Sequence, residues 1–149
     1  MAQLDVTRGD TKEWELRFLD SDQNPVSISG ATVWWTVRGA IPVPPTEDVA
    51  DAEAIVRGWW QHNGASVVSA GLTGPDGQSG GLFEAIDPSL GTMRVKLYPR
   101  LTTQLPASAP GGGAWHYDVQ MSRSAEDVHT WDAGTLKVAL DATRRTTVP

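Results

Sequence analysis

The feature that most constrains the fold of this chain is a period-two alternation of apolar and polar residues in short segments. In residues 12–20, Trp14, Leu16 and Phe18 alternate with charged side chains, and residues 31–38 alternate in the same way. This pattern is typical of a β-strand that buries one face. Because 15 glycines and 10 prolines interrupt the 149 residues, the alternating segments stay short and helices are disfavoured.

The remaining segments extend the same prediction along the chain. Further strands are expected at 53–60, 82–86, 92–98, 114–122, 128–133 and 135–140, and one helical turn at 100–105. About eight short strands separated by turns predict an all-β protein, a single antiparallel immunoglobulin-like β-sandwich domain over residues 1–149. Two long loops are expected as insertions, a proline-rich one at 39–52 and a glycine-rich one at 61–81. Within the second loop a turn is expected at 74–77, and Val67 and Val68 are candidates for a small hairpin.

Composition excludes several classes of protein. The chain has no cysteine, which removes disulfides, thiol nucleophiles and thiolate metal sites. The formal net charge of −6 is opposite to that of a general nucleic-acid binder, so no nucleic-acid partner is expected. No apolar run approaches about 18 residues, and the first residues lack the pattern of a signal peptide. We therefore expect synthesis in the cytoplasm and no membrane partner.

Candidate catalytic and metal-binding residues are few. His116 and His129 fall on the two strands of an expected hairpin and are predicted to be neighbours on one face, while His62 stands apart. Two imidazoles are too few ligands for a zinc site. Glu13 and Glu15 lie on the polar face of a strand, which favours a solvated role over acid–base chemistry. No serine lies in a Gly-x-Ser-x-Gly elbow. The sequence thus predicts no enzyme, no cofactor and no metal, with a hydrolase of unrecognised type as an alternative.

Two short motifs have ordinary explanations. Residues 20–24 imitate the start of a calcium-binding loop, but the sixth position is Pro25 and the twelfth is Ala31, where glycine and glutamate are required. Residues 8–10 spell the adhesion tripeptide Arg-Gly-Asp directly before a strand, where glycine and aspartate are common turn residues. Both motifs are interpreted as turns.

The seven tryptophans are the unusual part of the composition. Trp14 and Trp35 lie on the apolar faces of their strands and are predicted to be core residues. Trp34 lies on the opposite face from Trp35, and Trp59 and Trp60 point to opposite faces, so at least one of that pair is expected at the surface. Such indoles are covered by a second layer such as the 61–81 loop, form a protein interface, or stack on sugars.

Several segments together resemble a known family. They are Arg-Gly-Asp-Thr at 8–11 before the strand at 14–18, the segments 20–26 and 28–33, Ala-Ile-Val at 54–56, and the later segments 86–95, 115–121 and 134–138. The pattern is similar to the N-terminal domain of tailed-bacteriophage baseplate upper proteins and covers most of residues 5–141. The resemblance implies an immunoglobulin-like building block of the virion without catalytic residues. Residues 39–81 are expanded relative to that family.

These inferences combine into one functional expectation. The chain is expected to be a non-enzymatic virion structural protein of the baseplate, tail, neck or capsid surface, which assembles with itself and with other virion proteins. The candidate assembly interface consists of Trp34, Ile41, Pro42, Val43, Pro44, Pro45, Trp59, Trp60, Val67 and Val68. The terminal arms 1–6 and 144–149 are second candidates. The alternative is a carbohydrate-binding module that contacts host-surface glycan through Trp34, Trp59 or Trp60.

Overall fold

The computed structural model describes residues 2–39, 54–63, 66–108, 114–124 and 127–139. Strands make up 65% and helix 4% of this part of the chain, which confirms the all-β class. The elements in chain order are β1 (Ala2–Thr7), β2 (Lys12–Arg17), β3 (Thr32–Arg38), β4 (Ala54–Asn63), β5 (Ser66–Thr73), β6 (Ser79–Asp87), β7 (Thr92–Leu97), α1 (Pro99–Thr102), β8 (Trp115–Ser124) and β9 (Asp127–Ala139).

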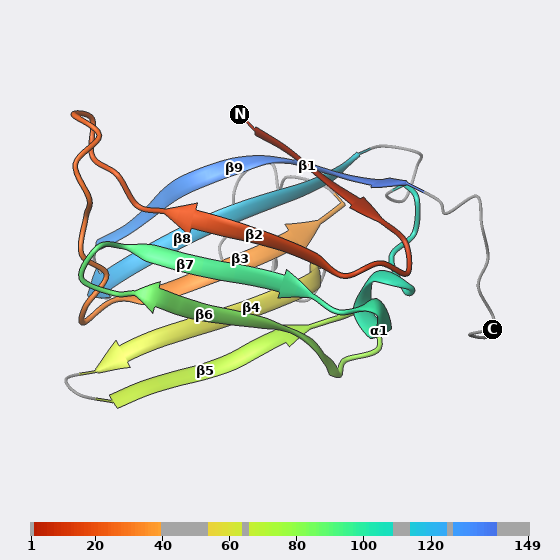
Figure 1. Ribbon diagram of the computed structural model, residues 1–149, viewed down its shortest axis with the longest axis horizontal. Helices are drawn as coiled ribbons and strands as arrows, with labels where there is room; N and C mark the ends of the chain where they lie inside the picture. Colours follow the sequence, from red (N-terminus) through yellow and green to blue (C-terminus); the bar gives the residue numbers. More distant parts are fainter. Residues whose placement is uncertain (1, 40–53, 64–65, 109–113, 125–126, 140–149) are drawn as a thin grey trace.

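All nine described strands belong to one sheet that curls into a nearly closed barrel (Figure 1). Their order is β1-β9-β8-β3-β4-β5-β6-β7-β2, and β1 pairs with β9 in parallel while the other described pairs are antiparallel. The two-sheet, immunoglobulin-like sandwich is not confirmed. Strands β3 to β7 are paired in chain order within a single hydrogen-bonded sheet. Because this sheet nearly closes on itself, it has few free edges.

The prediction of a loop at 61–81 is wrong over most of that range, because strands occupy it. Strand β4 continues through Asn63, and β5 runs back beside it, with a bulge between Trp59 and Trp60. The glycines here serve close packing of the backbone, because a Cβ on Gly58 would lie 2.6 Å from the carbonyl oxygen of Gly71. Only the turn at 74–77 is confirmed, where the Gly77 amide donates to the Gly74 carbonyl at 3.0 Å.

Two further boundaries differ from the sequence prediction. The expected strands at 128–133 and 135–140 form one strand, β9. The N-terminal arm at 1–6, the second candidate for an assembly surface, is largely the strand β1, whose Leu4 and Val6 lie opposite Leu136 and Val138 of β9. The proline-rich loop at 39–52 lies outside the described residues from position 40 onward.

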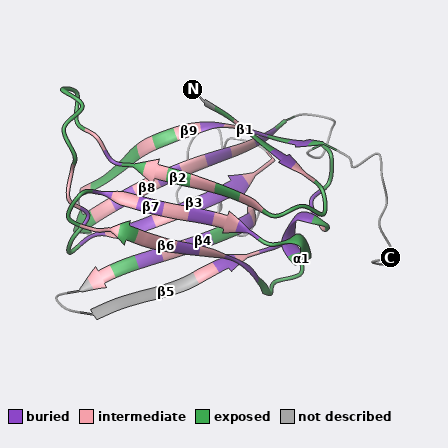
Figure 2. Ribbon diagram, viewed as in Figure 1, coloured by how far each residue is buried: buried purple, intermediate pink, exposed green. Residues whose placement is uncertain are grey.

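Buried residues alternate with more exposed ones along the strands of the barrel and form its core (Figure 2). Trp35 has no exposed surface and packs between Trp14 and Tyr117, with ring centroids 6.1 Å and 6.3 Å away. Such offset aromatic contacts add to the stabilisation that comes from removing large apolar surfaces from water. The predicted core positions of Trp14 and Trp35 are confirmed, Trp14 being half-buried and packed against the core.

Helix α1 covers one end of the barrel. Its Leu101 is buried against Gly74 and Gly80, where a Cβ would lie 3.0 Å and 2.6 Å from Leu101 side-chain atoms. The Thr102 hydroxyl accepts the Gly9 amide at 3.1 Å and donates to the Asp10 carbonyl at 2.8 Å. The turn that joins β1 to β2 is therefore held on the same helix.

Candidate interaction surface

Two tryptophans lie directly opposite each other on the outer side of the sheet. Trp34 of β3 and Trp59 of β4 are register partners and are both half-buried. Their neighbours Val33 and Trp35 are fully buried, so strand alternation turns Trp34 away from the core. We call Trp34 and Trp59 the outer tryptophan pair. Partly exposed indoles on a sheet face are a feature of binding surfaces.

Polar residues surround the outer tryptophan pair. Gln120 of β8 lies opposite Trp34, and the Thr36 hydroxyl, one position further along the same face, donates to the Asp118 carboxylate at 2.7 Å. Arg57 is exposed and lies opposite Thr36. An aromatic centre with a polar border matches the composition of protein interfaces.

Trp60 does not belong to this surface, and its assignment to the candidate interface is wrong. It is 1% exposed, lies opposite Val33 inside the barrel, and stacks on His62 at a centroid distance of 5.9 Å. The alternation of β4 separates Trp59 from Trp60, and the barrel encloses the face that Trp60 occupies. His62 is held by the Gly30 amide, which donates to its Nδ1 at 3.0 Å.

The structure describes only some of the other candidate interface residues. Val67 and Val68 lie on β5, opposite His62 and Gln61. Ile41, Pro42, Val43, Pro44 and Pro45 lie outside the described residues, as does the arm at 144–149. The structure thus brings Trp34 and Trp59 together, and it does so through a register that alternation alone does not specify.

The two hairpin histidines are not neighbours, contrary to the prediction. His116 lies opposite Thr135, whereas His129 lies opposite Met121 and contacts Asp127 at 2.5 Å. Within the described ranges, no group of three or more histidine, aspartate or glutamate residues is arranged to hold a metal ion. In the same part of the chain, no helix has the length and apolar character needed to cross a membrane.

The two short motifs form turns. The Asp20 carboxylate accepts the amides of Asp22 and Asn24, both at 2.9 Å, so it closes its own turn. In the adhesion-like tripeptide, the Arg8 side chain donates to the Thr103 carbonyl at 3.0 Å, and Gly9 has a φ of +87°. These contacts fix the tripeptide against the segment that includes α1.

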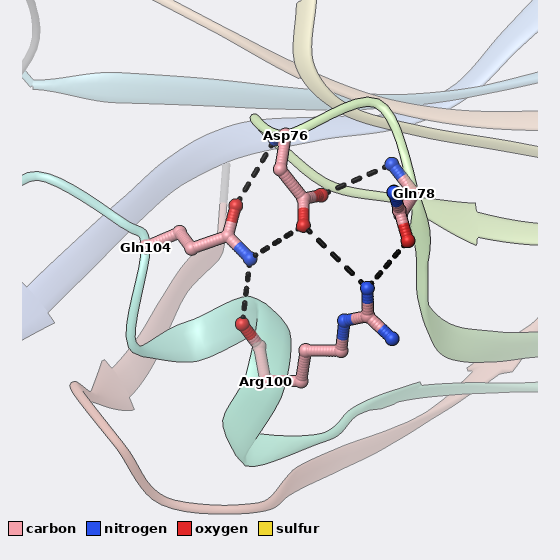
Figure 3. A network of polar contacts seen from close by, with 4 residues as sticks. All are labelled: Asp76, Gln78, Arg100 and Gln104. Carbon is pink, nitrogen blue, oxygen red and sulfur yellow. Dashed lines mark hydrogen bonds and ion pairs between the residues drawn. The ribbon is translucent and has the colours of Figure 1, made fainter.

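A polar network that sequence reasoning missed joins α1 to the β5–β6 turn (Figure 3). The Gln104 side chain donates to the Asp76 carboxylate at 3.1 Å and accepts the Asp76 amide at 3.0 Å. Arg100 donates to Gln78 at 2.5 Å and lies 3.9 Å from Asp76. The sequence signals only the turn, because the partners are more than 20 residues apart. These contacts hold α1 in place at the end of the barrel.

Acidic pH is expected to weaken the polar network around Asp76. The backbone hydrogen bond from Gln78, helped by Gln104 and Arg100, lowers the pKa of Asp76 below its usual 3.8. Since the folded pKa is the lower one, the stabilisation is present above the unfolded value and is lost as the pH falls through the folded value. Asp76→Asn should therefore unfold at a lower urea concentration than the parent protein at pH 6, and the difference should shrink at pH 3. An equal difference at both pH values would contradict this role.

Alkaline pH is expected to destabilise the fold by ionising the Tyr117 phenol. Burial, with the adjacent carboxylate of Asp132, raises the pKa of Tyr117 to about 12 from the usual 10.0. The phenol donates to Asp132 at 3.1 Å, so only its protonated form fits the site. Because the folded pKa is the higher one, stability is complete below pH 10 and falls as the pH rises toward 12. Urea unfolding at pH 9 and pH 11 should show a smaller loss in Tyr117→Phe than in the parent protein.

Comparison with known proteins gives no family assignment. No protein-family model matches the chain, and no curated protein matches it.

Proposed function

We propose that this chain is a non-enzymatic structural protein of a tailed-bacteriophage virion that assembles with itself and with other virion proteins. The observation that carries the proposal is the outer tryptophan pair, two large aromatic side chains paired on the outer face of the sheet. A docking role accounts for their placement, because aromatic anchors dominate the binding energy of protein interfaces. The similarity of the strand and turn segments to baseplate upper proteins supplies the virion context.

The position of the pair favours docking onto another protein. Trp34 and Trp59 lie on central strands of the sheet, where the backbone is hydrogen-bonded on both sides. A rigid platform loses little conformational entropy when it binds a partner. Asp118 and Gln120 at its border can supply hydrogen bonds around an apolar centre, while the Thr36 hydroxyl is buried and already donates to Asp118.

Particle association tests the proposal. Quantitative mass spectrometry of purified virions, from a host that carries the gene, should detect the parent protein at a fixed copy number. Incorporation of the Trp34→Ala/Trp59→Ala variant should fall by about tenfold or more, as expected for the loss of two anchors. Tyr98→Ala, which removes an exposed aromatic ring elsewhere, serves as the control and should leave incorporation unchanged. Absence of the parent protein from particles would contradict the proposal.

A carbohydrate-binding module is the second candidate. Two adjacent indoles on one sheet face are also the arrangement that stacks on sugar rings. Binding to a glycan array by the parent protein, lost in Trp59→Ala with an unchanged circular dichroism spectrum, would favour this function. Trp60→Ala is unsuitable for that test, because Trp60 is a core residue.

A further inference from the structure

The barrel is open along one line, where the two end strands of the sheet face each other. Strands β1 and β2 are the first and last in the strand order, and among the described residues neither is paired with a strand on that side. The turn of residues 8–11 joins them at one end of this line, and Figure 1 shows both on the same side of the barrel. We call the space between the free edges of β1 and β2 the seam. Free edges expose unpaired amide and carbonyl groups that can bind another strand.

Inward-facing side chains along the seam are incompletely covered. Leu4, Trp14 and Leu16 are only half-buried, although all three pack against the core. Their register partners on the paired side, Leu136, Val95 and Met93, are 0–1% exposed. Within the described ranges, each of these residues is thus flanked by a paired strand on one side and by no strand on the seam side. One added strand would cover all three.

A buried hydrogen-bond donor on the neighbouring strand β9 also indicates that the described residues leave the seam unfilled. The indole Nε1 of Trp131 is buried and has no hydrogen-bond acceptor among the described residues. Trp131 lies in β9 before Gly134, where β1 begins to pair, and its ring contacts Phe18, just beyond β2, at 5.5 Å. A buried unpaired donor is costly, so an acceptor supplied by an added segment would stabilise the assembly.

We propose that the seam binds residues 140–149 of a second copy of this chain as an added strand between β1 and β2. This inference deepens the proposed self-assembly and rests on it. Thr146, Thr147 and Val148 are β-branched, the residue type that strands favour. Because the added strand would have a neighbour on both sides, its amide and carbonyl groups would be hydrogen-bonded along its length.

The charges of the two parts are complementary. The charged residues of β1 and β2 are Asp5, Lys12, Glu13, Glu15 and Arg17, three acids against two cations. Glu13 lies 2.6 Å from Arg94 and Glu15 lies 3.0 Å from Arg17, so the net charge of the two strands is a small negative one. Residues 140–149 contain Arg144 and Arg145 against a single acid, Asp141. Opposite charges of this kind favour association and make it weaker at high salt.

Residues 140–149 of the same copy are badly placed to form the added strand in their own seam. The Arg8 amide donates to the Ala139 carbonyl at 2.9 Å, so residue 140 follows at the end of the seam that the β1–β2 turn closes. Entering there requires the chain to cross that turn, and such crossings are rare. Reaching the open end means passing six residues of β1, about 20 Å, which consumes roughly six of the ten residues. A second copy can enter from the open end.

A cross-linking experiment tests the proposal directly, because the chain has no native cysteine. The double variant Glu15→Cys/Thr147→Cys should form disulfide-linked dimers and longer ladders on a non-reducing gel after mild oxidation. The matched control, Gln61→Cys/Thr147→Cys, has its first cysteine on β4, on the other side of the barrel, and should remain mostly uncross-linked. Equal cross-linking of the two variants would overturn the proposal.

Backbone pairing is tested in the full chain by two substitutions at one position. Thr147→Pro removes an amide donor and should weaken self-association by roughly tenfold in sedimentation equilibrium. Thr147→Val keeps the donor and the β-branched shape and should associate like the parent protein. If the parent protein self-associates and Thr147→Pro does so equally, the seam is not the binding site, while the proposed self-assembly stands. If the parent protein does not self-associate at all, the self-assembly and the seam binding both fail.

Discussion

Replacing Gly91 with alanine is expected to lower the free energy of unfolding by about 4 kcal/mol or more, a large part of the total for a domain of this size. Gly91 has a φ of +63°, and a Cβ there would lie 2.1 Å from the Val26 carbonyl oxygen. Its own carbonyl accepts the Phe18 amide at 2.8 Å, so the backbone on both sides is held in place. Urea unfolding followed by tryptophan fluorescence measures the loss.

Gly77 provides the matched control for this substitution. It also has a positive φ, +76°, but no atom lies within 4 Å of the Cβ position. Gly77→Ala should therefore lose only the conformational part, about 1–2 kcal/mol. If both variants unfold at the same urea concentration, the close approach of Gly91 to Val26 is not what requires glycine.

The second large effect is expected at Trp60. Its replacement by alanine removes a large core side chain and should cost about 3–5 kcal/mol of unfolding free energy. Trp59, the adjacent residue on the outer face, is half-buried, so Trp59→Ala should cost less than half as much. Thermal and urea unfolding of the two single variants measure the difference directly. A larger loss in Trp59→Ala would mean that the faces of β4 are assigned the wrong way round.

Alternation in the sequence predicts the strands whose two faces differ in polarity. Strands β2, β3 and β7 were predicted within a few residues, because apolar side chains enter the barrel and polar ones leave it. Strand β5 was expected only as a small hairpin at Val67 and Val68 inside a loop, because its serine and glycine content gives little such signal. Its position depends on backbone pairing with β4 and on close approach at Gly58.

The sheet topology was not predictable from the same signal. A sandwich and a barrel both require alternating strands, and the difference lies in which strands pair. Here β3 pairs with β8, and β1 pairs with the distant β9. Such pairings join segments about 80 to 130 residues apart, so no local pattern encodes them.

The candidate surface was predicted in part for a related reason. Alternation correctly separated Trp34 from Trp35 and Trp59 from Trp60, but it did not say which face of β4 is enclosed. The register then placed Trp59 opposite Trp34 and Trp60 opposite Val33. The exposed member of the Trp59–Trp60 pair is decided by tertiary structure alone.

Self-assembly is tested most directly by sedimentation velocity of this 149-residue chain over a wide concentration range. The sedimentation coefficient should rise with concentration, as a chain of 16.0 kDa forms larger species. Added salt should reduce this rise, because the seam and the segment 140–149 carry opposite net charges. A single monomeric species at every concentration would contradict the account.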